Sequence, residues 1–301
     1  MKTFKTILLL LYCTFMLLSI ALAAETTSKC STVKLVEWKA GTAIHYGQYV
    51  PEENGEVLSP EDINQPRSLI LDSKGNIYIG DSVNYRILKF DKDGRFLMKF
   101  ALQKPLRGNK QPFGDVIKDM AVDVHDNLYV INLYEYRIEM YNPSGKLVKT
   151  INYLSDKLGL GKDFWEAAGR GYEAEYLDLD KDGKIYVYSD YSQKMALGGI
   201  YSRDGKLLTR GIKFDDFGGT KLDFLRRFIR FTGYSLDILS EVGGMKKDNA
   251  IAVLNNAGGK ELSRCSINIE PTTRTYIDKK GNVYFFEHNT LDVMMARMLQ
   301  E

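Results

Sequence analysis

The sequence predicts an all-β fold, a β-propeller built from four-stranded antiparallel blades. One motif, an aspartate and a tight turn followed by a short apolar strand, occurs at 72–79, 123–130, 180–187 and 278–285. A second set of turn glycines, at 94, 145, 205 and 259, recurs roughly every fifty to sixty residues. A repeat of this length, made only of short strands and turns, is typical of a radial array of sheets.

The clearest repeat is 65–100, which is expected to form one complete blade. Its predicted strands, from the inner to the outer one, are 67–71, 77–80, 86–90 and 96–100. Gly75 and Gly94 lie in the turns between the first and the last pair of strands, where a positive φ is required.

The later repeats follow the same order with decreasing regularity. The second and third cover 118–151 and 174–211. The fourth is degenerate, with outer strands at 250–254 and 261–269 and inner strands expected within 228–232 and 235–241. The fifth begins at 272, has strands at 283–286 and 293–298, and then lacks an outer strand.

An isolated strand near the N-terminus, 33–38, is expected to complete the last blade. Such closure would remove an exposed sheet edge. Five blades are countable, and a sixth is possible if 43–58 forms strands. In this arrangement Cys30 precedes the outer strand of blade five and Cys265 lies in the outer strand of blade four. A disulfide between them is predicted, with two unpaired cysteines as the alternative.

The first residues, 1–23, have the character of a secretory signal peptide. Lys2 and Lys5 precede an apolar run over 7–22, and Ala21-Leu22-Ala23 is a small-x-small cleavage site. A membrane anchor is the alternative, but the run is short for a span and no positive stop-transfer cluster follows. We therefore expect 24–301 to form a single propeller domain that is exported to the periplasm or the extracellular space, with no membrane span after cleavage.

The charge balance excludes one class of partner. The chain has 41 Lys and Arg against 39 Asp and Glu, and loss of Lys2 and Lys5 makes the mature chain neutral. Neutrality argues against nucleic acid as the ligand. A protein, peptide or glycan ligand is expected instead, bound by a monomer.

Residues 75–87, which read GNIYIGDSVNYRI, and the FDKDG of 90–94 resemble the NHL repeat. The second repeat keeps fewer of the same positions, among them Asn127, Tyr129, Arg137 and Gly145. The resemblance implies a propeller, usually of six blades. NHL proteins include exported bacterial proteins, lyases, and protein- or RNA-binding modules, so the resemblance implies fold far more than activity.

Function is expected on one face of the propeller. The long connections 103–116, 152–173, 213–227 and 242–249, with the segment 39–65, all fall on the face opposite the tight turns. Long loops on a rigid scaffold commonly carry function. The predicted ligand-binding residues on this face are Arg67, Asp81, Tyr85, Lys118, Asn132, Tyr136, Glu175, Asp190, Arg274 and His288.

This charged, tyrosine-rich rim favours a non-enzymatic binding or scaffold module. The alternative is a lyase or hydrolase that acts on a lactone, glycan or peptide, with His288 among its acid–base groups. No catalytic residues are assignable. Arg86 and Arg137 recur at one repeat position, which predicts a structural role between blades.

No cofactor is expected, although Ca²⁺ or Zn²⁺ stays an alternative. The chain has three histidines, His45, His125 and His288, which is weak support for a metal. His125 is expected in a turn on the other face. Residues 178–183 resemble the start of an EF-hand, but Ser189 stands at the twelfth position, where a bidentate glutamate is needed. The segment is therefore interpreted as a hairpin turn.

Overall fold

The computed structural model describes the chain in separate ranges, and all regular structure in them is β-strand. The ranges are 30–37, 52–53, 56–57, 66, 68–82, 84–102, 117–132, 137–153, 176–180, 182–189, 195–213, 234–240, 250–256, 260–269, 275–287 and 290–299. The prediction of an all-β fold is thus confirmed in the described part of the chain.

The first blade matches its prediction closely. Its strands are β4 (Leu69–Leu71), β5 (Ile77–Asp81), β6 (Arg86–Phe90) and β7 (Phe96–Ala101), paired antiparallel in that order. The turn between β4 and β5 and the turn between β6 and β7 each contain a glycine with positive φ, 79° at Gly75 and 81° at Gly94. Tight turns of this kind explain why each strand pairs with the next one along the chain.

The second and third blades repeat this arrangement. The second consists of β8 (Ile117–Val122), β9 (Leu128–Asn132), β10 (Arg137–Tyr141) and β11 (Leu147–Asn152). The third consists of β12 (Tyr176–Leu179), β13 (Ile185–Ser189), β14 (Met195–Tyr201) and β15 (Leu207–Lys213). Each is an antiparallel sheet of four strands, as predicted.

The fourth blade has three described strands. They are β16 (Tyr234–Ser240), β17 (Ala250–Asn256) and β18 (Glu261–Ile267). The inner strand expected at 228–232 lies outside the described residues.

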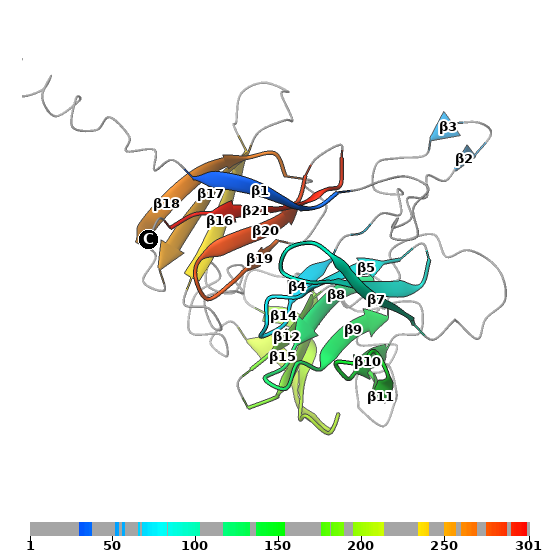
Figure 1. Ribbon diagram of the computed structural model, residues 1–301. Helices are drawn as coiled ribbons and strands as arrows, with labels where there is room; N and C mark the ends of the chain where they lie inside the picture. Colours follow the sequence, from blue (N-terminus) through cyan, green and yellow to red (C-terminus); the bar gives the residue numbers. More distant parts are fainter. Residues whose placement is uncertain are drawn as a thin grey trace, which may run out of the picture.

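The N-terminal strand completes the fifth blade, as predicted, although it begins two residues earlier than expected. This sheet contains β1 (Ser31–Val36), β21 (Val293–Arg297), β20 (Asn282–Phe286) and β19 (Tyr276–Ile277) in that order. Figure 1 shows β1, in blue, alongside the red β21. The two ends of the domain therefore meet in one sheet.

The remaining strands, β2 (Glu52–Glu53) and β3 (Glu56–Val57), form a separate two-stranded sheet. In Figure 1 this sheet lies apart from the five larger ones. In the part of the chain that the structure describes, the segment 43–58 therefore contributes this hairpin and no four-stranded blade.

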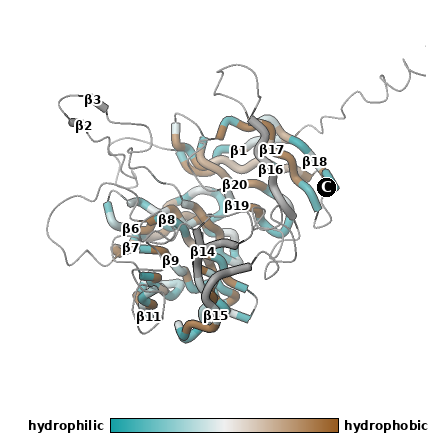
Figure 2. Tube along the Cα trace, turned by 180° about the vertical axis from the view of Figure 1, so that it is seen from behind, coloured by the Kyte–Doolittle hydropathy of each residue, from teal (hydrophilic) through white to brown (hydrophobic). Residues whose placement is uncertain are grey.

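Neighbouring blades share apolar cores, and these cores order the blades. Separate clusters join the fourth blade to the fifth, the fifth to the first, the first to the second and the second to the third. In Figure 2 the apolar segments follow the strands, as along β17. β5 and β9 are buried along their whole length, whereas β7 and β11 expose alternate side chains. This order is that of a propeller with β7 and β11 at its rim. The remaining interface, between the third and fourth blades, stays a prediction.

In the first three blades, the turn before the outer strand packs against the outer strand of the preceding blade. A Cβ at Gly94 would lie 1.6 Å from the carbonyl oxygen of Leu35 in β1. A Cβ at Gly145, the matching turn of the second blade, would meet Phe100 and Met98 of β7 at under 3 Å. For the first blade, the strand in this place is β1, so the N-terminal strand serves as the outer strand that the fifth repeat lacks.

A disulfide joins Cys30 to Cys265, with their Cα atoms 5.5 Å apart. Cys30 immediately precedes β1, and Cys265 lies in β18 of the neighbouring blade. The predicted disulfide is confirmed. β1 is also held by an ion pair from Lys34 to the buried Asp292.

Candidate functional site

The propeller has two faces with different connections. The loop face carries the loops between the two middle strands of each blade, such as 82–85, and the turn face carries the tight turns at 72–76 and 91–95. Four predicted site residues are described, all near the loop face: Asp81, Tyr85, Lys118 and Asn132. The others lie outside the described residues: Arg67, Tyr136, Glu175, Asp190, Arg274 and His288.

Asp81 is the anchor of the first loop on this face. Its carboxylate is fully buried at the end of β5. It accepts hydrogen bonds from the side-chain amide of Asn84, at 2.9 Å, and from Nε of Arg86, at 2.6 Å. The ion pair with Arg86 compensates the buried charge. The Asp81 side chain therefore links the end of β5 to Asn84 and to the start of β6.

Tyr85 turns the chain into β6. Its φ of 51° is unusual for a residue with a side chain, and its carbonyl oxygen accepts a 2.8 Å hydrogen bond from the amide of Leu102. The ring is half-buried and packs on the core between the first and second blades. Its backbone thus links the loop to the chain that leaves β7.

The second blade has a different buried carboxylate at the matching ends of its middle strands, β9 and β10. Glu139 in β10 is fully buried. Its Oε1 accepts from Asn132 at 2.9 Å and from Nε of Arg137 at 2.7 Å, and its Oε2 accepts from the hydroxyl of Tyr141. Asn132, a predicted ligand residue, is itself buried here. We did not predict Glu139, but a glutamate inside an otherwise apolar strand was the available signal.

The two recurring arginines both form ion pairs with buried carboxylates. Arg86 pairs with Asp81 and Arg137 with Glu139, each within its own blade. A role of these arginines between blades stays a prediction.

Another carboxylate connects the inner strands of three blades. Asp119 in β8 is buried, and its Oδ2 accepts a 2.9 Å hydrogen bond from the amide of Leu177 in β12. The hydroxyl of Ser68, beside β4, donates to its Oδ1 at 3.4 Å. Lys118, its half-buried neighbour, is a predicted ligand residue. Asp119 was also missed, because its partners lie more than fifty residues away in the chain.

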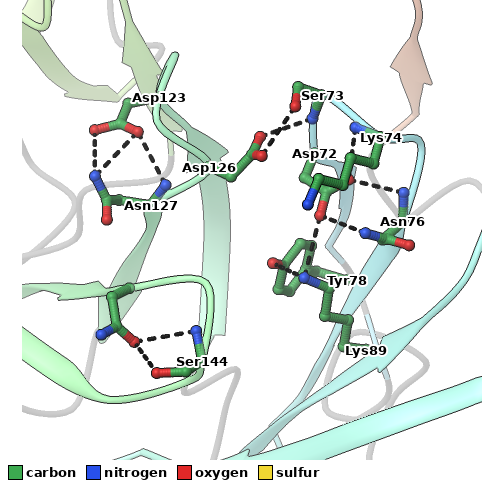
Figure 3. A network of polar contacts seen from close by, with 11 residues as sticks. Asp72, Ser73, Lys74, Asn76, Tyr78, Lys89, Asp123, Asp126, Asn127 and Ser144 are labelled. Carbon is green, nitrogen blue, oxygen red and sulfur yellow. Dashed lines mark hydrogen bonds and ion pairs between the residues drawn. The ribbon is translucent and has the colours of Figure 1, made fainter.

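The turn face is organised by the recurring aspartate of the motif. Oδ1 of Asp72 accepts from the amides of Lys74 and Asn76, at 3.0 and 2.9 Å, and Oδ2 accepts from the Asn76 side chain at 2.8 Å. Figure 3 shows the same arrangement at Asp123 and Asn127. The motif therefore encodes the turn.

A buried lysine is added to this turn only in the first blade among the four copies of the motif. Lys89 donates to the hydroxyl of Tyr78 at 2.6 Å and pairs with Asp72 at 3.1 Å (Figure 3). Met140 and Met295 occupy the matching positions of the second and fifth blades, and Ile200 that of the third.

The charged residues in this group shift one another's pKa values. Burial alone would raise the pKa of Asp72, but hydrogen bonds from Asn76 and the contact with Lys89 outweigh it and lower the pKa below its ordinary value. Burial would lower the pKa of Lys89, but Tyr78 and Asp72 outweigh that effect and raise it. Both groups are therefore held in their charged forms.

The turns of neighbouring blades also contact one another. Asp126 of the second blade accepts hydrogen bonds from the amide and the hydroxyl of Ser73 of the first, at 2.8 and 2.9 Å (Figure 3). His125 lies in this turn and is exposed, as predicted. Asp180 accepts from the amides of Asp182 and Lys184, which confirms a hairpin turn at the segment that resembles an EF-hand.

The described ranges lack two further features. No group of three or more histidine, cysteine, aspartate or glutamate side chains in them is placed to hold a metal ion. Within the same ranges, no helix has the length and apolar character needed to cross a membrane.

Comparison with known proteins finds no matching protein-family model and no matching curated sequence. A streptogramin B lyase structure is 13% identical, with 92% of this chain and 90% of that chain covered and a TM-score of 0.37. Virginiamycin B lyase from Staphylococcus aureus is 12% identical, with 81% and 68% covered and a TM-score of 0.35. The Dos1 propeller is 11% identical, with 76% and 57% covered and a TM-score of 0.32. Likenesses this distant carry no argument, so the architecture rests on the sheets and their shared cores.

Proposed function

We propose that the protein is an exported, NHL-like propeller that binds a peptide or glycan on its loop face without catalysing a reaction. The observation that carries this proposal is a pair of buried ion pairs at the loop face. In two consecutive blades, a buried carboxylate pairs with the arginine that begins the third strand, Asp81 with Arg86 and Glu139 with Arg137. These ion pairs fix the strand ends on which the loop face is built.

Rigid strand ends suit binding for a physical reason. A binding surface that is already ordered loses less conformational entropy when a ligand arrives, so more of the contact energy appears as affinity. Asp119, which joins the inner strands beneath the same face, adds rigidity between blades.

The class of ligand follows from the side chains expected around these buried carboxylates. Lys118 is half-buried beside Asp119, and Tyr136 directly precedes Arg137, the partner of Glu139, in the sequence. Tyrosine rings offer a flat apolar surface with a polar end, and lysine offers donors for carboxylate or hydroxyl oxygens. Export is supported by the signal-like segment 1–23 and by the disulfide, which suits an oxidising compartment.

The proposal is tested by screening residues 24–301 against glycan and peptide arrays. Lys118→Ala and Tyr136→Ala should weaken binding of the ligand found by about tenfold each, the effect of losing 1.4 kcal/mol. Val124→Ser, on the 70% exposed turn-face residue Val124, is the matched control and should leave binding unchanged.

Two results would overturn the proposal. One is a ligand whose affinity neither loop-face variant alters. The other is turnover of a lactone, glycan or peptide that His288→Ala abolishes while the fold is kept. That second result would establish the lyase or hydrolase alternative, and loss of turnover in chelator would show that it depends on a metal.

A further inference from the structure

We infer that the Cys30–Cys265 disulfide is a thiol–disulfide exchange site whose reduction releases strand β1 from the propeller. β1 is the outer strand of its sheet and pairs with β21 alone. Of its six residues only Val36, at the far end from Cys30, is buried. The end of β1 next to the disulfide has no comparable apolar attachment, since Ser31 and Thr32 are exposed.

The other contacts of β1 lie away from this end. The ion pair of Lys34 with Asp292 and the contact of Leu35 with the turn at Gly94 hold its second half. The first half is held by its hydrogen bonds to β21 and by the covalent link to β18. Strands with few buried side chains open at low free energy, so loss of the link should let this half of β1 detach first.

The two sulfurs differ in accessibility, which sets the course of the exchange. Cys30 is half-buried, whereas Cys265 is 3% exposed and packs among apolar residues. A thiolate of an external dithiol therefore attacks the sulfur of Cys30, and Cys265 leaves as a thiolate that takes up a proton. The second thiol of the reductant then attacks the mixed disulfide. Cys30 is released as a thiol, and the reductant, now a disulfide, has given up two electrons and two protons.

Release of β1 would change the surface of the fifth blade. The free edge of β21 would present unpaired backbone groups, which are prone to pair with another strand. It would also uncover Met298 and Ala296, which pack in the core that Cys30 borders. Reduction thus converts a covered edge into an exposed one.

Hydrogen exchange of the mature protein, before and after reduction with a small dithiol, tests this inference. Amides of 30–37 and of β21 should lose protection in the reduced protein. Amides of β9 and β10 in the second blade should keep theirs, which distinguishes release of β1 from global unfolding. The double variant Cys30→Ser, Cys265→Ser should show the exchange pattern of the reduced protein and no response to the dithiol.

A second variant separates the disulfide from the other attachment of β1. Lys34→Ala removes the ion pair with Asp292. It should leave 30–37 protected while the disulfide is intact and accelerate their exchange once it is reduced. The inference is wrong if reduction leaves β1 protected, or if all blades lose protection together. If the double variant does not fold, reduction of the folded wild-type protein still decides between these results.

Discussion

A single side-chain oxygen, most often from an aspartate, stabilises each of several tight turns. Asp72 and Asp278 both accept hydrogen bonds from the amides two and four residues later. Asn142 does the same in a turn of the second blade through its side-chain oxygen. The acceptor oxygen is therefore what the turn requires, and the negative charge has a separate role where a cation is close.

The separate role of charge is testable at Asp72. Asp72→Asn should keep the turn, as Asn142 does, and lose the ion pair with the buried Lys89. At neutral pH we expect the variant to be less stable by about 1.5–3 kcal/mol, the range for hydrogen bonds to charged groups. Urea unfolding at a series of pH values measures the difference.

The pH dependence of this difference has a definite sign. The folded pKa of Asp72 is lowered, so its ionised form stabilises the protein fully above the unfolded pKa of about 3.9. That contribution is lost as the pH falls through the lower folded pKa. The two proteins should therefore converge in stability as the pH falls below the lowered folded pKa of Asp72. Asp204→Asn, at a side chain that is 95% exposed, is the control and should match wild type throughout.

Alanine substitutions at two glycines with the same backbone conformation distinguish the stability cost of backbone strain from that of steric overlap. Gly94→Ala should destabilise the protein by about 2 kcal/mol or more, because its φ is +81° and the new Cβ would overlap the carbonyl of Leu35. Gly75→Ala has φ +79° but meets nothing closer than 3.6 Å, so it should lose only about 1 kcal/mol from strain. Thermal unfolding compares them. Equal losses would contradict the packing of this turn on β1.

Between elements, polar contacts supplement the apolar cores at both faces. On the turn face, Arg203 of the third blade lies 3.6 Å from Asp123 of the second, and Asp126 bonds to Ser73. Under the loop face, Asp119 spans the inner strands β4, β8 and β12. These directional bonds fix how each blade sits against the next, which apolar packing alone specifies less strictly.

The inner-strand contact of Asp119 gives a prediction at this scale. Asp119→Ala leaves the buried amide of Leu177 without this acceptor and should destabilise the protein by about 1–3 kcal/mol. Asp204→Ala, the same substitution at a side chain that is 95% exposed, should change stability little. Urea unfolding of both variants is the measurement. An Asp204 variant that is as unstable as the Asp119 variant would contradict this assignment.

For the whole molecule, the main feature is that the N-terminal strand pairs with the C-terminal one. β1 occupies the outer position of the fifth blade, and the disulfide ties it to the fourth. This pairing spans nearly the whole domain, so the fifth blade is complete only when both ends of the chain are present. Contacts of such long sequence separation form late and slowly in folding.

Processing of the N-terminus is the prediction at this scale. Cleavage after Ala23 would leave six residues, 24–29, before Cys30. N-terminal sequencing of the exported protein should therefore begin at Ala24, and its two remaining cysteines should not react with a thiol reagent before reduction. A product that keeps 1–23 and stays with membranes would show that this segment is an anchor.

The local parts of the fold could be predicted from the sequence alone. β6 has the bounds that were predicted, and the disulfide between Cys30 and Cys265 follows from the position of β1. Turns and strands depend on residues within a few positions of each other, such as Asp72, Asn76 and Gly75, so a repeated motif contains enough information to place them.

The roles of polar residues were decided by the tertiary structure. The sequence placed Asp81 and Asn132 on a ligand-binding rim, but folding buries both beside arginine or glutamate. The sequence offered a signal for Glu139, but the partners of Glu139 and Asp119 could not be assigned beforehand, because they depend on which side chains and amides packing brings close. Whether a carboxylate is available to a ligand or paired within the protein depends on neighbours that only packing brings together. For this physical reason the sequence alone determined the blades, whereas the tertiary structure decided their polar contacts.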